Sequence, residues 1–119
     1  MITGSYIIEI PRIEKILKKN KFIAKLYSPQ EMKFLMEKHF PVFSIAEMFC
    51  AKCAFMKAMG ISSAGIKMSE ISVLTDYSGA YYISLAGKAK KAFAIKKARI
   101  SISCSHTKNL ASAIVIFYE

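Results

Sequence analysis

The chain has 119 residues, of which 54% are hydrophobic and 22% are charged, so we expect a single domain, residues 1–119, with one ample core. This composition argues against disorder, and the apolar run 110–118 is far shorter than the roughly 20 residues of a membrane-spanning helix. The amino terminus has no basic flank before its short apolar part, so it does not resemble a secretory signal. We therefore expect a soluble, cytoplasmic protein with no membrane partner.

Basic residues dominate the charge: 18 lysine and arginine residues against 8 acidic ones give a formal net charge of +10. Basic residues cluster between Arg12 and Lys25, and no acid occurs between Asp76 and Glu119. Such a field attracts an acidic partner, whereas a solvated basic face that only maintains solubility is the alternative for each lysine. Nucleic acid is a less favoured partner, because the chain lacks the interleaved aromatic and basic residues of stacking platforms and any helix-turn-helix or zinc-finger frame.

The first predicted element is a strand over residues 2–10, which are rich in isoleucine and alternate weakly. Pro11 ends it, because proline cannot donate a ladder hydrogen bond and suits the first turn of a helix. Ile13, Ile16 and Leu17 then recur at helical spacing, which predicts a short amphipathic helix with its lysines outward.

Two helix starts follow. In SPQE, Ser28 can accept from a backbone amide three residues on while Glu31 reaches back, as in a capping box. SIAE, residues 44–47, repeats the pattern, so a second helix is expected to begin at its serine, run to Met59 and stop at Gly60. This second helix is apolar around most of its circumference and should be the buried central helix.

The second half of the chain alternates like strands. We expect strands over residues 70–74, 81–85, 99–105 and 111–118. DYSGA provides the turn between the first two, HTKN (106–109) links the last two as a hairpin, and residues 87–97 form a short basic helix. In the third strand one face carries Ile100, Ile102 and Cys104 and the other carries Ser101, Ser103 and Ser105. The predicted class is α+β, with an antiparallel sheet and a buried central helix.

Four segments together resemble the bacterial holo-acyl-carrier-protein synthase family, which are small phosphopantetheinyl transferases. They are GSYIIEIPRIEKI, FCAKCAFMKAMG, EISVLTDYSGAYYISLAGKAK and ISISCSHTKNLASAIVI, in the family's order and spacing over almost the whole chain. The resemblance implies a 4'-phosphopantetheinyl transferase-like fold, a homotrimer with sites between subunits, and transfer of phosphopantetheine from coenzyme A to a serine of acyl carrier protein in fatty acid biosynthesis. It also implies a magnesium ion held by an aspartate of the first strand and a glutamate of the central helix.

The chain departs from the family at both metal positions. Tyr6 stands where the family has its aspartate, and Cys53 stands where it has its glutamate. Magnesium requires hard oxygen ligands in octahedral geometry, whereas a phenol must ionise to bind it well and a thiol prefers zinc or copper. We expect no metal at Tyr6 and Cys53, and magnesium is doubtful as a cofactor. For Tyr6 the alternative is simple packing.

Other family positions are retained. Glu9 matches a second acid of the first strand and Lys57 a lysine one turn beyond the lost glutamate, and both are candidate catalytic residues. The alternative for Lys57 is a half-buried lysine that reaches solvent. The resemblance implies coenzyme binding by His106, Ser105, Thr107 and Gly60.

Other departures from the family pattern argue against strong coenzyme binding. The alternative for His106 is a surface or capping residue, as is common for a histidine in a hairpin turn. The turn GISSAG has fewer glycines than the family's phosphate-binding turn, and Met48 replaces a family arginine.

The resemblance also implies a docking segment for an acidic carrier protein, made of Arg12, Lys21, Phe22 and Lys25. One apolar anchor among charges favours fast, salt-sensitive encounter. In the alternative interpretation Phe22 is a core residue and the charges are solvated.

The pair of cysteines in CAKC permits a second reading, a zinc site. Cys50 and Cys53 offer two ligands at helical spacing, so Cys104 and His106 would have to complete it. We prefer to interpret CAKC as a site whose catalytic acid was replaced, with Cys50 as core packing.

The favoured hypothesis is a family member that still docks an acidic carrier protein, with magnesium-dependent transfer lost or strongly weakened, that is, a pseudoenzyme. The alternative is an active transferase whose magnesium site is rearranged around Glu9. A non-specific nucleic-acid binder is the third hypothesis. The sequence leaves open whether the chain is an enzyme and whether coenzyme A binds.

Overall fold

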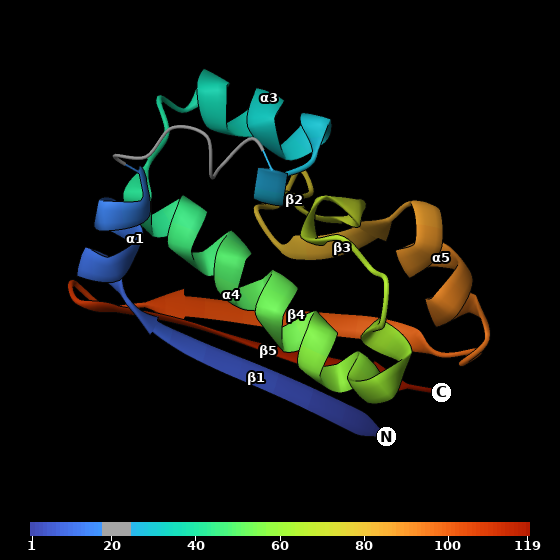
Figure 1. Cartoon of the computed structure of the whole chain (residues 1–119). Helices are drawn as coiled ribbons and strands as arrows, with labels where there is room; N and C mark the ends of the chain where they lie inside the picture. The colour runs from blue at the N-terminus through green and yellow to red at the C-terminus, as the bar shows by residue number, and fades with distance from the viewer. Residues whose placement is uncertain (18–24) are drawn as a thin grey trace.

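The structure, a computed structural model that describes residues 1–17 and 25–119, consists of two antiparallel sheets and the helices around them (Figure 1). The larger sheet has the strand order β1-β5-β4, with β1 (Ile2–Glu9), β5 (Leu110–Tyr118) and β4 (Arg99–His106). The smaller sheet pairs β2 (Ile71–Thr75) with β3 (Tyr81–Leu85). The predicted α+β class is confirmed, with the strands divided between two sheets. No helix of the described residues has the length and hydropathy needed to cross a bilayer.

Helix α4 (Val42–Met59) lies along the inner face of the larger sheet, and its small residues allow a close approach to β1 (Figure 1). A Cβ added at Gly4 would lie 2.1 Å from the carbonyl oxygen of Ala54 and 2.8 Å from the amide nitrogen of Ala58. The helix and the strand therefore touch backbone to backbone at Gly4. The expectation of a buried central helix is confirmed, and the fully buried side chains include Ile45, Met48, Cys50, Ala51, Ala54 and Phe55.

Helix α3 begins where the sequence predicts, and α1 begins one residue earlier, at Ile10, which the sequence analysis placed in the first strand. Helix α1 (Ile10–Leu17) follows β1 directly, with Pro11 in its first turn. Helix α3 (Pro29–Glu37) has the predicted capping box: the Ser28 hydroxyl accepts from the Glu31 amide at 3.2 Å, and the Ser28 amide donates to the Glu31 carboxylate at 2.9 Å.

The predicted start of α4 is wrong by two residues. The helix begins at Val42 after Pro41, whose φ of −65° leads into a helical turn, and no side chain caps it. Glu47 does not reach back to Ser44 as a capping box would require, because its carboxylate contacts two side chains outside the helix. The predicted stop is confirmed, since Gly60 has a φ of +59°.

The second half of the chain follows the predicted order with small shifts of boundary. Strand β4 includes His106, so the hairpin turn begins at Thr107, whose amide donates to the Leu110 carbonyl at 2.7 Å. Helix α5 (Gly87–Ala94) is shorter than the predicted 87–97, and Lys97 has a φ of +50°, which a helix does not allow. The 3-10 turns η1 (Gly60–Ser63) and η2 (Met68–Glu70) complete the described elements. The isoleucine face of β4 is half-buried and the serine face exposed, as predicted.

A buried ion pair fixes α3, α4 and β2 to one another. Lys52 Nζ lies 2.5 Å from Glu31 Oε1, and both side chains have no exposed surface. Lys52 also donates to the Met68 carbonyl at 2.8 Å, and the other Glu31 oxygen accepts from the Val73 amide at 2.9 Å. Burial raises the pKa of Glu31 and lowers the pKa of Lys52, while the pairing opposes both shifts.

Candidate functional site

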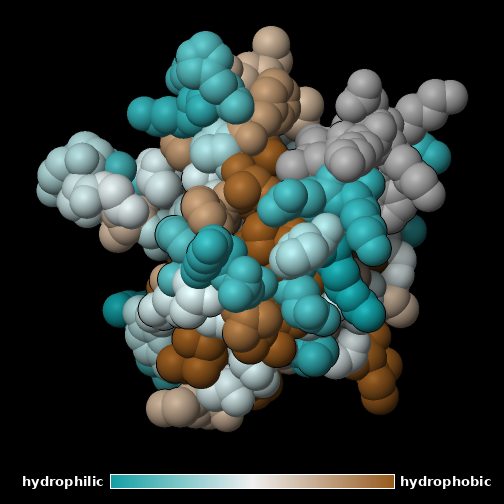
Figure 2. Space-filling model, turned by 90° about the vertical axis from the view of Figure 1, so that its left-hand side faces the viewer, coloured by the Kyte–Doolittle hydropathy of each residue, from teal (hydrophilic) through white to brown (hydrophobic). Residues whose placement is uncertain are grey.

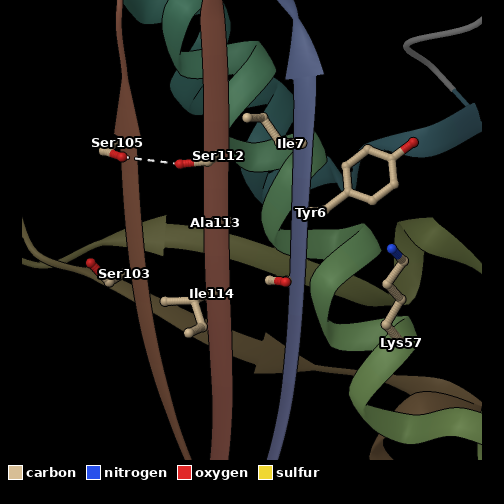
Figure 3. A pocket seen from close by; sticks show the side chains of 9 residues that line it. Tyr6, Ile7, Lys57, Ser103, Ser105, Ser112, Ala113 and Ile114 are labelled. Atoms are coloured by element: carbon tan, nitrogen blue, oxygen red, sulfur yellow. Dashed lines mark hydrogen bonds between the residues drawn. The ribbon is translucent and has the colours of Figure 1, made fainter.

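Tyr6 and Lys57 meet beyond the free edge of β1. The Tyr6 ring packs edge-on against Phe49 of α4, with centroids 6.1 Å apart, and Lys57 Nζ lies 5.1 Å from the centroid of the same ring. Figure 3 shows Lys57 reaching from α4 toward the Tyr6 ring at the side of β1. Because residues four apart lie on one helix face, Cys53 stands between Phe49 and Lys57 on the face that Tyr6 covers. The structure thus brings Tyr6, Cys53 and Lys57 together.

The donor set at this place does not fit magnesium. Burial raises the pKa of the Cys53 thiol to about 11, although Lys57 and Lys52 oppose the shift, so the thiol is protonated near neutral pH. A neutral thiol and a phenol supply no hard carboxylate oxygen for a small dication. Within the described ranges, 1–17 and 25–119, no three His, Cys, Asp or Glu side chains are grouped so that they could hold a metal ion.

Glu9 does not line the cavity beside Lys57, although it lines a smaller cavity of about 200 Å³ together with Tyr6 and Arg12. Its side chain points to the opposite face of β1 from Tyr6, because positions three apart in a strand alternate, and it is 68% exposed. The Glu9 carboxylate lies 4.0 Å from the guanidinium of Arg12.

His106 belongs to a second cluster at the other edge of the sheet. Its Nδ1 lies 3.0 Å from Glu47 Oε2, and the Tyr81 hydroxyl donates to Glu47 Oε1 at 2.9 Å. Because a carboxylate only accepts, His106 donates through Nδ1 and presents Nε2 outward. The Phe43 ring stacks on the imidazole, with centroids 4.5 Å apart and planes 12° apart.

Glu47 is the residue of this cluster that the sequence analysis missed. Its side chain is only 11% exposed, and burial together with its hydrogen bond raises the pKa of Tyr81. In the sequence Glu47 fits a capping box. The signal against that reading was Pro41, which can begin the helix earlier and so release Ser44 and Glu47 from a cap.

Of the other predicted coenzyme-binding residues, Ser105 lines a cavity that Tyr6 and Lys57 also line, whereas Thr107 and Gly60 do not. Ser105 Oγ is 3.0 Å from Ser112 Oγ on the outer face of the sheet, and the Thr107 hydroxyl accepts from the Leu110 amide at 3.1 Å inside the hairpin turn. Gly60 ends α4, and a Cβ added there would meet no atom within 4 Å.

One chain cannot bring His106 to Lys57. In the register of the larger sheet, Tyr6 pairs with Ala113 and Ala113 pairs with Cys104, so the two edges are separated by two strand spacings, about 10 Å. Tyr6 and Lys57 lie at the β1 edge, whereas His106 and Thr107 lie at the β4 edge. The predicted site residues therefore form two half-sites.

A shallow cavity of about 490 Å³ extends from the Lys57 side chain around β1 onto the outer face of the sheet. Figure 3 shows its lining across β1, β5 and β4, with Tyr6 and Lys57 at one side. The polar side-chain groups of its lining are one ammonium group, one phenol and several serine hydroxyls. The lining residues are Ser5, Tyr6, Ile7, Lys57, Ser103, Ser105, Ser112, Ala113 and Ile114.

Two of the four predicted docking residues are described. The Arg12 side chain is 75% exposed, and Lys25 is exposed. Lys21 and Phe22 lie outside the described residues.

The three cysteines differ in burial and in their contacts. Cys50 is fully buried, its Sγ donates to the Ala111 carbonyl at 3.4 Å, and burial raises its pKa to about 12. Cys104 Sγ contacts the Glu47 carbonyl at 3.9 Å, and all three cysteines are free thiols. Cys50 is thus core packing, as expected.

Comparisons with known proteins agree with the resemblance seen in the sequence. A model of the 4'-phosphopantetheinyl transferase superfamily matches residues 7–114. The chain is 36% identical over 115 residues to the holo-[acyl-carrier-protein] synthase of Treponema denticola, covering 95% of this chain and 94% of that protein. It is 37% identical over 119 residues to the synthase of Natranaerobius thermophilus, covering 98% and 95%.

Solved structures of the same kind superpose on the whole chain. The holo-[acyl-carrier-protein] synthase of Neisseria meningitidis matches with a TM-score of 0.88 at 26% identity and covers 100% of both chains. The synthase of Helicobacter pylori, in complex with coenzyme A, matches with a TM-score of 0.80 at 28% identity and covers 98% of this chain and 99% of that one.

Proposed function

Because the chain belongs to the holo-acyl-carrier-protein synthase family of the 4'-phosphopantetheinyl transferase superfamily, we propose that it still docks an acidic acyl carrier protein but has lost most or all magnesium-dependent transfer. The relatives named above are synthases, and one of the matching structures holds coenzyme A, so coenzyme A is the small molecule that this fold would accept. The proposal separates two parts of the family reaction, docking and metal-assisted transfer.

The observation that carries the proposal is the contact between Tyr6 and Lys57. The two positions where the family implies magnesium ligands hold a phenol and a protonated thiol, and an ammonium group lies against the phenol ring. Transfer from coenzyme A builds negative charge on the diphosphate, which a metal ion neutralises in the family reaction. Without carboxylates to hold that ion, the chain lacks the main means of lowering the barrier.

The proposed docking surface does not include Tyr6, Cys53 or Lys57. Figure 2 shows the side of the molecule that carries α1, where hydrophilic groups surround separated hydrophobic ones. Arg12 is exposed there and the chain has a net charge of +10, which suits an acidic helix as partner. Such a surface gives fast encounter that weakens as salt increases.

The two half-sites support the proposal of a trimer. A ring of copies can place the β4 edge of one copy, with His106, beside the β1 edge of the next, with Lys57. The outer face of the larger sheet is uncovered in one chain and exposes large apolar side chains, namely Ile7, Leu110, Ile114 and Tyr118. Packing these faces around a three-fold axis would bury them.

The test mixes the protein with coenzyme A, magnesium and an apo carrier protein and follows the mass of the carrier. We expect no rapid, magnesium-dependent gain of phosphopantetheine, while the two proteins still associate in a salt-sensitive manner. Rapid gain that requires magnesium would contradict the proposal.

Two variants identify the cause of either result. Glu9→Gln abolishes turnover if Glu9 holds a rearranged metal site, which is the alternative to loss. If transfer has been lost through the two replaced ligands, Tyr6→Asp combined with Cys53→Glu raises magnesium-dependent activity from the background.

A further inference from the structure

The second half of the chain gathers exposed basic residues around α5. No acidic residue occurs between Asp76 and Glu119. Figure 1 shows α5 at the opposite end of the molecule from α1, so these residues are separate from the proposed carrier-docking surface. Together they form the α5 basic surface, which consists of Lys88, Lys90, Lys91, Lys97 and Arg99.

Packing of the other side of α5 turns this surface outward. Ala89 is fully buried, and the Phe93 ring packs against Phe55 of α4 and Phe117 of β5, with centroids 6.1 and 4.9 Å away. Helix α5 therefore lies on the side of the larger sheet that carries α4. It does not lie on the outer face that the proposed trimer would bury.

One large apolar side chain lies within the α5 basic surface. Ile95 directly follows α5 with helical φ and ψ of −63° and −31°, and it is 82% exposed. Because residues three, four and seven apart share a helix face, Lys88, Lys91 and Ile95 follow one another along the outer side of the helix. Ile95 can leave water only if a partner covers this surface.

The lysines of this surface are free to meet an external anion. In residues 1–17 and 25–119, no carboxylate oxygen lies within 4.0 Å of the ammonium groups of Lys88, Lys91 or Lys97. Glu70 does contact the start of α5, but its carboxylate accepts from the backbone amides of Lys67 and Lys88, both at 2.9 Å. Glu70 thus caps the helix and leaves the side-chain charges unpaired.

We propose that the α5 basic surface binds the surface of an anionic lipid bilayer. Lysine is a compact point charge that suits a diffuse layer of headgroup phosphates, whereas paired recognition of one phosphate favours arginine. Each lysine near an anionic membrane strengthens binding about fivefold, and Ile95 can enter the boundary between headgroups and acyl chains. Such peripheral binding needs no membrane-spanning helix, so it revises only the expectation of no membrane partner.

Other anionic partners fit this surface less well. Nucleic acid offers phosphates, but an isoleucine provides no ring on which a base could stack. An acidic protein offers carboxylates, but it would have to supply a recess for Ile95, whereas a bilayer accepts an apolar side chain anywhere along its interface. The proposal is independent of the proposed loss of transfer and of carrier docking at α1.

Cosedimentation of the full chain with vesicles tests the proposal. We expect binding to vesicles that mix phosphatidylglycerol with phosphatidylcholine, binding that weakens as salt rises, and no binding to phosphatidylcholine alone. The triple variant Lys88→Gln, Lys91→Gln and Lys97→Gln should bind the anionic vesicles about a hundredfold more weakly, at about fivefold for each lysine.

A matched control removes the same charge from another part of the molecule. Three exposed lysines of α1, of α3 and of the α3 C-cap are replaced together, in the variant Lys15→Gln, Lys33→Gln and Lys38→Gln. This variant should keep most of the affinity for anionic vesicles, because its substitutions lie outside the α5 basic surface. Circular dichroism checks that both triple variants are folded.

A tryptophan reports the contact directly, because the chain contains none. In Ile95→Trp the emission should shift to shorter wavelength on anionic vesicles, since the ring enters the membrane interface. Tyr77→Trp, at a fully exposed position in the β2–β3 turn, should not shift. Ile95→Gln leaves the net charge unchanged and should weaken binding about tenfold through the lost apolar contact.

Three results would overturn the proposal: no binding of the intact chain to anionic vesicles, equal loss of affinity in the two triple variants, or no emission shift at position 95. If position 95 responds to a DNA duplex or to an acidic carrier protein but not to vesicles, the surface belongs to that partner and the proposal is likewise overturned. The vesicle assays contain neither coenzyme A nor a carrier protein, so their outcome is separate from the mass assay of the proposed function.

Discussion

At the scale of single residues, the two half-sites differ in their carboxylates. Glu47 accepts a hydrogen bond from His106 at the β4 edge, whereas Tyr6 and Lys57 meet at the β1 edge. That Tyr6 and Cys53 stand where the resemblance implies magnesium ligands could be proposed from the sequence, because the flanking residues keep the family spacing. The contact of Tyr6 with Lys57 could not, because it joins a strand and a helix about fifty residues apart. The predicted capping role of Glu47 is wrong for the same reason, since its hydrogen-bond partners Tyr81 and His106 are distant in sequence.

Glu47→Ala should lower the free energy of unfolding by about 2 kcal/mol, because it leaves the Tyr81 hydroxyl and the His106 imidazole without their acceptor. Urea denaturation measures the loss. Tyr81→Phe removes one of the two hydrogen bonds and should cost less, about 1 kcal/mol.

The same cluster has a spectroscopic signature. In Glu47→Gln the imidazole nitrogens of His106 should lose their fixed assignment of donor and acceptor, which nitrogen chemical shifts report. Unchanged nitrogen shifts in this variant would show that Glu47 does not orient His106.

At the scale of elements, local patterns were sufficient for most of the fold and failed where long-range contacts take over. The capping box at Ser28, the stop at Gly60 and the alternation along β4 are local signals, and each is confirmed. The start of α4 was predicted from Ser44 and Glu47, which fit a capping box. The Glu47 carboxylate instead contacts His106 of β4. The division of the strands into a three-stranded and a two-stranded sheet also depends on tertiary packing, which no local pattern encodes.

Gly4 sets the distance between β1 and α4, and with it the place where Tyr6 meets Lys57. Gly4→Ala should destabilise the chain by about 3 kcal/mol, because the new methyl group would lie 2.1 Å from a helix carbonyl. Thermal unfolding compares this variant with Gly60→Ala. The new methyl group at position 60 would meet no neighbouring atom, so only the strain of the positive φ should destabilise that variant, by about 1 kcal/mol. Equal losses for the two variants would refute the close approach.

The buried pair of Lys52 and Glu31 should matter more than any surface pair. Lys52→Met leaves a carboxylate inside the core and is expected to cost about 3–5 kcal/mol in chemical denaturation. Adding Glu31→Gln should recover part of that loss, since the uncompensated charge is removed. A double variant no more stable than Lys52→Met alone would argue against charge burial as the cause.

At the scale of the whole molecule, the separation of the half-sites makes assembly the central question. His106 and Lys57 lie at opposite edges of one sheet, and the face between them exposes isoleucines. A trimer, as proposed above, would join the edges and cover the face in one step. The family resemblance implies this assembly, and the arrangement of the strands supplies a physical reason to propose it.

Charge placed on the outer face should dissociate the assembly. Ile7→Glu and Ile114→Lys are expected to convert a trimer into monomers in light scattering coupled to size-exclusion chromatography, because each would bury an unpaired charge between sheets. Tyr77→Glu, at a fully exposed position in the β2–β3 turn, is the control and should stay trimeric. Trimers that survive both isoleucine substitutions would place the interface elsewhere.

We propose that Tyr6 and Cys53 do not hold a divalent cation. Crystals soaked with coenzyme A and manganese test it most directly, because manganese reveals itself by anomalous scattering at any magnesium site. We predict no anomalous peak beside Tyr6 and Cys53. An octahedral ion about 2 Å from its ligands, bridging the diphosphate and these side chains, would contradict the account.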